Sequence, residues 1–312
     1  MNRLNDRIYG ILFGQAIGDA LGLAAEGMSC DRVATTYPNG VNGYADIIQD
    51  DFRKRWAPGE WTDDTNQMLC ILDSLLELRT VDPNDIAARF VRWFHHDGRG
   101  IGRHTYNILR MPQYAQRPYE ISEFFWKFSR CNSAPNGALM RTCITGIWDY
   151  RDEAAVYENT ENICRLTHFD PRCVGLCVII AHIIRSELLG QTVTESDLLA
   201  LGARYAPEIE EFVRLGFQPD IAELCLDDPD TRGYTLRTLA AGLWAYNFGT
   251  DFRSTIQTLI TAGGDVDTNC AVAGALLGVR MGYAALPEDW VHGLLRYDEL
   301  AEKARQLTAI LY

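Results

Sequence analysis

Residues 10–22 read Gly-Ile-Leu-Phe-Gly-Gln-Ala-Ile-Gly-Asp-Ala-Leu-Gly, with a glycine at every fourth position. In a helix, residues four apart lie on one face, so these glycines form a ridge without side chains. Glycine inside a helix costs about 1 kcal/mol relative to alanine. We expect close backbone packing in the centre of a helical bundle to offset this cost. Residues 267–282 show a similar face of small residues, so we expect both helices to be central.

The rest of the chain carries the same helical signal. Apolar residues recur at three- and four-residue spacing, and alternating strand patterns are nearly absent. No linker-like, low-complexity or repeated stretch divides the 312 residues. We therefore predict one domain over 1–312, an all-α fold arranged as an orthogonal helical bundle. The predicted helices are 3–22, 64–79, 84–96, 102–110, 137–149, 153–166, 172–189, 195–203, 233–247, 252–262, 267–282 and 296–310.

The composition limits the classes of partner. Hydrophobic residues make up 47% of the chain, and the formal net charge is −13. No run of Lys or Arg appears, which argues against nucleic-acid binding, and the acidic balance argues against a membrane surface. The apolar stretch from Ile8 to Ala25 contains Asp19, so we expect a buried helix and not a signal peptide or membrane span. An acidic protein that binds an anionic substrate needs cations or helix N-termini at its site.

The nine cysteines are odd in number and lack CxxC pairs. Cys164, Cys173 and Cys177 lie in or beside apolar helical stretches, where free thiols behave as small hydrophobic groups. We therefore expect structural thiols in a reducing compartment, the cytoplasm. We also expect the chain to act as a monomer.

One long irregular segment runs from Leu23 to Trp61 and is rich in Pro, Gly and Asn. Loops longer than about 15 residues inside compact domains are usually functional or disordered. Because this segment joins two candidate site elements, we predict a mobile lid that is less ordered than the flanking helices.

Two acidic clusters stand directly before predicted helices. The first is Trp61-Thr62-Asp63-Asp64-Thr65, and the second is Gly263-Gly264-Asp265-Val266-Asp267-Thr268-Asn269. Capping a helix needs one such side chain, and several adjacent acids repel one another unless a cation joins them. Carboxylates and hydroxyls are hard donors that suit Mg²⁺ or Mn²⁺ and disfavour zinc. We therefore favour metal binding over capping alone, with two octahedral ions at the helix N-termini.

Three motifs occur in order along the chain: Gly14-Gln-Ala-Ile-Gly18-Asp19-Ala-Leu-Gly22 with Glu26, then Thr-Asp-Asp-Thr at 62–65, then Gly-Gly-Asp-x-Asp-Thr-Asn at 263–269. This arrangement resembles the ADP-ribosylglycohydrolase family. The resemblance implies an all-α, single-domain fold with a binuclear Mg²⁺ or Mn²⁺ site. It also implies catalytic roles for Glu26, Asp64 and Asp267, whereas Asp19 is expected to support the loops. The implied metal ligands are Thr62, Asp63, Asp64, Asp265, Asp267 and Thr268.

Two further segments fit the resemblance. Ser133-Ala-Pro-Asn136-Gly137-Ala138-Leu-Met140-Arg141 resembles the family's glycine-rich phosphate loop. Because it opens a predicted helix, its amides and the helix dipole could hold a pyrophosphate, although an ordinary Pro-initiated helix start is the alternative. Thr167-His168 matches a Thr-His pair that places the histidine near the phosphates. We assign His168 no acid–base role.

One segment departs from the family pattern. Residues 98–105 align with a loop that is Asp-Ile-Gly in many arginine-directed members. Gly100 stands where that aspartate would be, and Asp97 just upstream could substitute for it. Gly100 and Gly102 are candidate ligand contacts.

The resemblance implies a hydrolase that releases ADP-ribose from ADP-ribosylated protein or another modified target, with arginine and serine linkages both open. We expect metal-assisted hydrolysis at the anomeric carbon of the distal ribose, with Glu26 accepting a proton or positioning the water. One alternative is an ADP-ribose-binding or structural protein on the same scaffold, without hydrolysis. Another is an unrelated metal-dependent phosphatase. The mutually repelling acids are all present, which argues against a site that has lost its catalytic activity.

Overall fold

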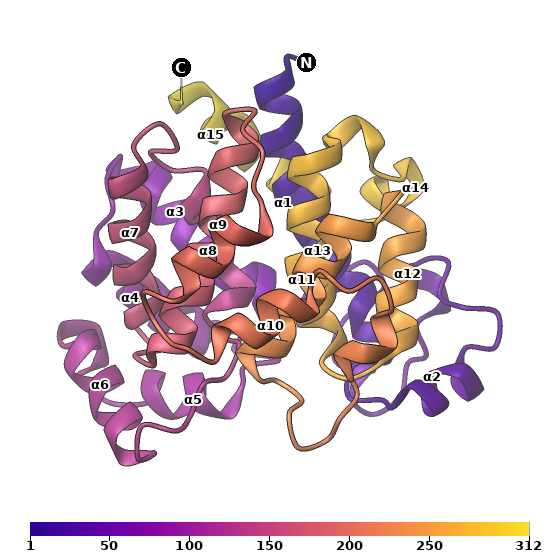
Figure 1. The fold of residues 1–312 in the computed structure, drawn as a ribbon, viewed down its shortest axis with the longest axis horizontal. Coiled ribbons are helices and arrows are strands. Elements are labelled where there is room, and N and C mark those ends of the chain that lie inside the picture. Colours follow the sequence, from indigo (N-terminus) through magenta and orange to yellow (C-terminus); the bar gives the residue numbers. More distant parts are fainter. Residues whose placement is uncertain (312) are drawn as a thin grey trace.

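Helices α1 (Arg3–Gly22) and α13 (Val266–Met281) run side by side through the centre of the protein in the computed structural model, which describes residues 1–311 (Figure 1). A Cβ added to any of the first three glycines of the α1 ridge would overlap with a backbone carbonyl of α13. The two helices are therefore antiparallel and touch backbone to backbone. The pairs are Gly10 with Gly278, Gly14 with Gly274, and Gly18 with Cys270.

This pairing sets the position of the chain after α1. The fourth glycine, Gly22, packs on the first turn of α13, where an added Cβ would lie 2.6 Å from the Cα of Asp267. The end of α1 and the start of α13 therefore lie together, which brings Glu26 to the second acidic cluster.

Helix α1 with its extension to Ala25 is long and apolar enough to cross a membrane by length and composition. However, 94% of that apolar window is buried inside the protein. Its burial agrees with the predicted role of a central core helix.

The other helices surround this pair. Helices α11 and α12 pack against α13, α8 packs against α7, and α3 packs against α4, around one continuous hydrophobic core. No strand forms within residues 1–311, where an isolated antiparallel bridge joins Pro135 to Tyr234. The predicted all-α fold is confirmed. The remaining α-helices are α2 (Cys30–Thr36), α3 (Asp63–Leu78), α4 (Pro83–His96), α5 (Arg103–Leu109), α6 (Pro118–Phe128), α7 (Glu153–Arg165), α8 (Pro171–Leu188), α9 (Glu195–Gly202), α10 (Ile209–Leu215), α11 (Thr235–Phe248), α12 (Phe252–Ala262), α14 (Glu288–His292) and α15 (Tyr297–Ile310). The 3₁₀ segments are η1 (Leu23–Ala25), η2 (Tyr44–Asp46), η3 (Arg53–Arg55), η4 (Tyr114–Gln116), η5 (Leu139–Gly146), η6 (Ile221–Leu224) and η7 (Tyr283–Ala285).

Two groups of elements differ from the prediction. The helix predicted at 137–149 is the 3₁₀ segment η5, in which Thr145 donates a hydrogen bond to the Thr142 carbonyl. Such side-chain bonds to nearby carbonyls compete with the α-helical ladder. Helices α2, α6, α10 and α14 were missed because they have 5 to 11 residues and show the apolar period over few turns.

The segment from Leu23 to Trp61 is not irregular throughout, because it contains η1, α2, η2 and η3. Buried Arg53 ties its middle to its buried start by donating hydrogen bonds to the carbonyls of Leu23, Ala24 and Glu26 at 2.8–2.9 Å, and Gln257 and Trp290 donate to the carbonyls of residues 41 and 42. The Tyr44 hydroxyl also donates to the Trp290 carbonyl at 2.9 Å. The segment is therefore attached to the core at several points, whereas a free lid is attached only at its ends.

Candidate active site

A cavity of about 640 Å³ lies where the two acidic clusters meet. This volume is in the range of sites that enclose a small ligand. Except for Thr62 and Ala138, every site residue predicted from the sequence lines it. The predicted residues that line the cavity are Glu26, Asp63, Asp64, Gly100, Gly102, Ser133, Asn136, Gly137, His168, Asp265, Asp267 and Thr268.

The N-terminus of α3 is capped from another helix. The two carboxylate oxygens of Asp19, in α1, accept hydrogen bonds from the amides of Thr62 and Thr65, each at 2.9 Å. The N-cap residue itself, Thr62, makes no side-chain cap, and its hydroxyl donates to Asp64 at 3.2 Å. Asp63 and Asp64 are thus not needed as caps. This confirms the supporting position predicted for Asp19.

The N-terminus of α13 shows the same arrangement. Asp265 is the N-cap residue but makes no side-chain cap, and the Glu26 carboxylate accepts the Val266 amide at 2.7 Å. Oxygens of Glu26, Asp265 and Asp267 lie within 4.8 Å of one another. Capping therefore explains Asp19 and Glu26, and in part Asp267, which accepts the Thr268 amide at 2.8 Å, but it does not explain Asp63, Asp64 or Asp265.

Two glycines shape the loop before α13. Gly263 and Gly264 have φ values of +73° and +92°, which favour glycine. A Cβ at Gly264 would overlap with the Leu226 carbonyl, and one at Gly263 would lie 2.6 Å from the Met28 carbonyl oxygen. The loop is therefore wedged between two other segments, which holds Asp265 against the cavity.

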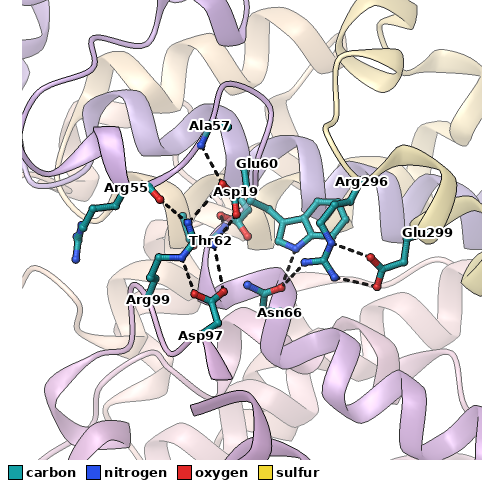
Figure 2. Close-up of polar contacts among 11 residues, drawn as sticks. Asp19, Arg55, Ala57, Glu60, Thr62, Asn66, Asp97, Arg99, Arg296 and Glu299 are labelled. Carbon is teal, nitrogen blue, oxygen red and sulfur yellow. Dashed lines mark hydrogen bonds and ion pairs between the residues drawn. The ribbon is translucent and has the colours of Figure 1, made fainter. Parts of the chain in front are cut away.

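A polar network fixes the start of α3 from outside the cavity (Figure 2). Buried Trp61 donates through Nε1 to Asn66 at 3.0 Å, and Arg296 donates to the same Asn66 oxygen at 2.8 Å. Arg99 donates to both Glu60 and Asp97, which ties the segment before α3 to the loop before α5. The first cluster is thereby held in place at both ends.

Without a cation, burial and mutual repulsion make the charged forms of these carboxylates unfavourable. Burial, with the charge of Asp19 next, raises the pKa of Asp63 to about 8. Burial, with the charge of Asp265 next, raises the pKa of Glu26 to about 7. The pKa values of Asp64 and Asp267 are raised well above the usual range, first by burial and then by neighbouring acids. Raised values of this kind follow from desolvation and like charge.

These residues fit a divalent cation site. The donor set consists of carboxylate and hydroxyl oxygens, which are the donors that Mg²⁺ and Mn²⁺ prefer. One carboxylate oxygen of Asp64 is buried and has no hydrogen-bond partner among the described residues. A bound cation would satisfy that oxygen and offset the repulsion between the acids.

The predicted phosphate segment forms a turn before η5, and this corrects the expectation of an α-helical dipole there. Among the described residues, no hydrogen-bond partner is present for the amides of Gly137 and Ala138, so both remain free to donate. The Asn136 side chain instead donates to Thr238 at 2.9 Å and to Asp265 at 3.1 Å. Asn136 thus orients an acid of the second cluster. Ala138 is buried and does not line the cavity.

The comparisons with known proteins agree with this site. The model of the ADP-ribosylglycohydrolase family matches residues 1–311. The chain belongs to that family. It is 24% identical to the ADP-ribosylarginine hydrolase Tri1 of Serratia proteamaculans, covering 97% of this chain and 79% of that protein. It is 25% identical to the ADP-ribosyl-[dinitrogen reductase] glycohydrolase of Rhodospirillum rubrum, covering 99% and 96%.

Two further matches extend over the same length. The ADP-ribosylhydrolase ARH3 of Gallus gallus is 25% identical, with 96% of this chain and 92% of that protein covered. A solved structure described as an ADP-ribosylglycohydrolase-related protein complex has a TM-score of 0.79, 29% identity and full coverage of both chains. The fold and the family therefore agree.

In this ADP-ribosylglycohydrolase family member, Gly100 packs against the first acidic cluster. Its φ is +89°, and an added Cβ would overlap with the Asp63 carboxylate. Asp97 does not take the place of an aspartate there, because both of its oxygens bond to Arg99 and it does not line the cavity. The substitution considered for Asp97 is therefore wrong.

In this family member, the cavity has an aromatic wall that was not predicted from the sequence. Phe52, Trp56, Phe125 and Phe128 line it, together with the exposed cations Arg103 and Arg232. Phe128 is 77% exposed. A cluster of aromatic residues at 124–128 was the available signal, but the apolar period alone does not separate a ligand-binding face from a core face.

Proposed function

We propose that the protein hydrolyses the bond between ADP-ribose and a modified protein or other target, with two Mg²⁺ or Mn²⁺ ions as cofactors. The observation that carries this proposal is that Asp19 and Glu26 cap the N-termini of α3 and α13 from other segments of the chain. Asp63, Asp64 and Asp265 therefore face the cavity without capping the two helices, and Asp267 faces it while its carboxylate accepts the Thr268 amide. Family membership supports the hydrolysis of ADP-ribosylated substrates as the reaction.

The cations would be held by the two clusters. Their proposed ligands are Thr62, Asp63, Asp64, Asp265, Asp267 and Thr268. When bound, two divalent cations supply Lewis-acid polarisation of the reacting groups at the ribose. Glu26 lies among the same oxygens and would position the attacking water or accept its proton.

The remaining walls of the cavity suit the rest of ADP-ribose. The free amide of Gly137 would hold the pyrophosphate, because backbone N–H groups bind anions without adding side-chain charge. The aromatic side chains of Phe125 and Phe128 offer flat apolar surface for the adenine. The distal ribose would then lie against the acids.

The linkage that is cleaved is a separate part of the proposal. Two of the relatives are named ADP-ribosylarginine hydrolase Tri1, and three are named ADP-ribosylhydrolase ARH3. Gly100 leaves the position beside Asp63 without an acidic side chain. We therefore propose that arginine is not the sole acceptor, and that a serine linkage is also a candidate.

The site and the thiols support a monomer in the cytoplasm. One chain supplies both acidic clusters and the phosphate segment of the cavity. All nine cysteines are free, as expected in a reducing compartment.

A release assay tests the proposal. ADP-ribosylated arginine, serine, threonine and nucleic-acid substrates would be incubated with the enzyme, and free ADP-ribose would be quantified. We expect release from at least one substrate, loss of release after thorough EDTA treatment, and recovery on addition of Mg²⁺ or Mn²⁺. Release that survives EDTA would contradict the two-cation site, and cleavage of phosphate esters without ADP-ribose binding would contradict the substrate.

A further inference from the structure

A chain of buried hydrogen bonds runs from the first acidic cluster to the phosphate side of the cavity. Gln67 donates through Nε2 to the Asp63 carboxylate at 2.9 Å. Arg141 donates to Gln67 Oε1 and to Thr167 Oγ1, each at 2.5 Å. Thr167 Oγ1 lies 2.7 Å from Nδ1 of His168. Five side chains therefore connect the two halves of the site.

Arg141 determines the direction of every bond in this chain. It is 1% exposed, its guanidinium lies 4.3 Å from the centre of the Phe90 ring, and it makes no ion pair among the described residues. A guanidinium has only donors and stays protonated in proteins. Thr167 Oγ1 and Gln67 Oε1 must therefore accept from it.

The direction at Thr167 fixes the proton on His168. Thr167 is fully buried, and its hydroxyl has no acceptor in the described part of the chain other than His168 Nδ1. The hydroxyl hydrogen therefore points to Nδ1, which must be the bare nitrogen of the ring. In a neutral imidazole the proton is then on Nε2.

The Nε2 atom of His168 has a suitable position for a ligand. It is buried and lacks a partner within residues 1–311. It lies 3.2 Å from the point where a Cβ of Gly137 would be, and both residues line the cavity. Burial, then the charges of His104 and Arg141, lowers the pKa of His168 well below its usual value, so the ring is neutral. An unpaired buried donor costs free energy unless a ligand accepts from it.

We propose that Arg141 and Thr167 are positioning residues that hold His168 as a neutral Nε2–H donor for a phosphate oxygen of ADP-ribose. The identity of the ligand rests on the proposed function, whereas the position of the proton does not. The same series of hydrogen bonds reaches Asp63 through Gln67. The buried guanidinium of Arg141 therefore orients both Asp63, a candidate metal ligand, and His168, the proposed phosphate donor.

Two measurements on Thr167→Val and Thr167→Ser test this. Long-range ¹H–¹⁵N spectra of ¹⁵N-histidine-labelled protein report which ring nitrogen carries the proton, with the His168 signals assigned from their loss in His168→Gln. Titration calorimetry at saturating Mg²⁺ measures ADP-ribose affinity. Thr160→Val is the matched control, because it removes a buried hydroxyl that bonds to Thr145 and the Val156 carbonyl.

We expect protonated Nε2 in the wild type and in Thr167→Ser, and loss of this preference in Thr167→Val. ADP-ribose should bind Thr167→Val about tenfold more weakly, as for a lost bond to a charged group. Thr167→Ser and Thr160→Val should stay within about threefold of the wild type. Protonated Nδ1 in the wild type, or equal affinity of Thr167→Val and wild type, would overturn the proposal. If the wild type binds no ADP-ribose, the proposed function fails, and the spectra still decide the proton position.

Discussion

At the scale of single residues, Gly137 is a position where we expect an added side chain to weaken ligand binding. A Cβ there would lie 3.1 Å from Thr105 Oγ1 and 3.2 Å from His168 Nε2. In Gly137→Val the added methyl groups would also cover the free amides of the turn. We expect ADP-ribose affinity to fall more than about tenfold by calorimetry, with metal binding largely unchanged. Gly43→Val is the control, because an added Cβ at Gly43 has no atom within 4 Å. Equal affinity in Gly137→Val and wild type would refute the phosphate turn.

The acids give a second prediction at this scale. Asp64→Asn and Asp267→Asn should each lower Mg²⁺ or Mn²⁺ affinity. In metal-free protein they should leave the free energy of unfolding unchanged or raise it by about 1 kcal/mol, because a buried and repelled charge is removed. Calorimetric metal titration and urea unfolding measure these effects. Exposed Glu158→Gln is the matched control. Wild-type metal affinity and rate in either variant would show that the ligand assignment is wrong.

At the scale of elements, the contact between α1 and α13 leaves no room for a methyl group. Gly18→Ala would place a Cβ against the Cys270 carbonyl, and backbone cannot move aside as a side chain can. We expect a loss of about 3 kcal/mol or more in the free energy of unfolding, beyond the usual cost of overpacking. Gly242→Ala in α11 meets a Val272 methyl at 2.9 Å and should cost about 1 kcal/mol. Urea unfolding compares the two, and equal losses would contradict the backbone contact.

The segment 23–61 belongs to the same scale. Arg53 anchors it through the three carbonyls described above, so Arg53→Met should speed amide hydrogen exchange across residues 23–61. Arg55→Met is the control, because the exposed Arg55 side chain, within residues 1–311, donates to the nearby Phe52 carbonyl and packs on the neighbouring rings of Phe52 and Trp56. We still predict faster exchange in this segment than in α1 and α3, and slower exchange with ADP-ribose and Mg²⁺ present. Exchange in wild-type protein as slow as in those helices would contradict a lid.

At the scale of the whole molecule, the charge of −13 repels an anionic ligand at long range. The Debye length falls from about 30 Å at 0.01 M salt to about 8 Å at 0.15 M, which screens this repulsion. With Mg²⁺ saturating, ADP-ribose affinity should therefore stay constant or rise by up to about threefold over that range. Calorimetry at the two salt concentrations measures it. A tenfold loss would indicate that Arg103 and Arg232, and not the neutral amides, hold the phosphates.

The sequence alone predicts the helical class, the central position of the two glycine-rich helices and most of the residues that line the cavity. These features depend on short-range patterns: a glycine every fourth residue, apolar spacing, and acids placed directly before helices. It could not identify η5, because the Thr142 and Thr145 side chains compete with the helical ladder only once the backbone is in place. It missed α6 and its aromatic wall, because an aromatic residue packs equally well in a core.

Which acids cap the two helices could be read from the tertiary structure alone. Asp19 caps α3 because it reaches across from α1. Glu26 caps α13 from the loop that follows α1. Both depend in turn on the antiparallel contact of α1 with α13, which joins residues more than 200 positions apart. The chain from Asp63 to His168 likewise joins residues 63, 67, 141, 167 and 168. Hydrogen-bond direction and burial are properties of neighbours in space, and no spacing along one sequence specifies them.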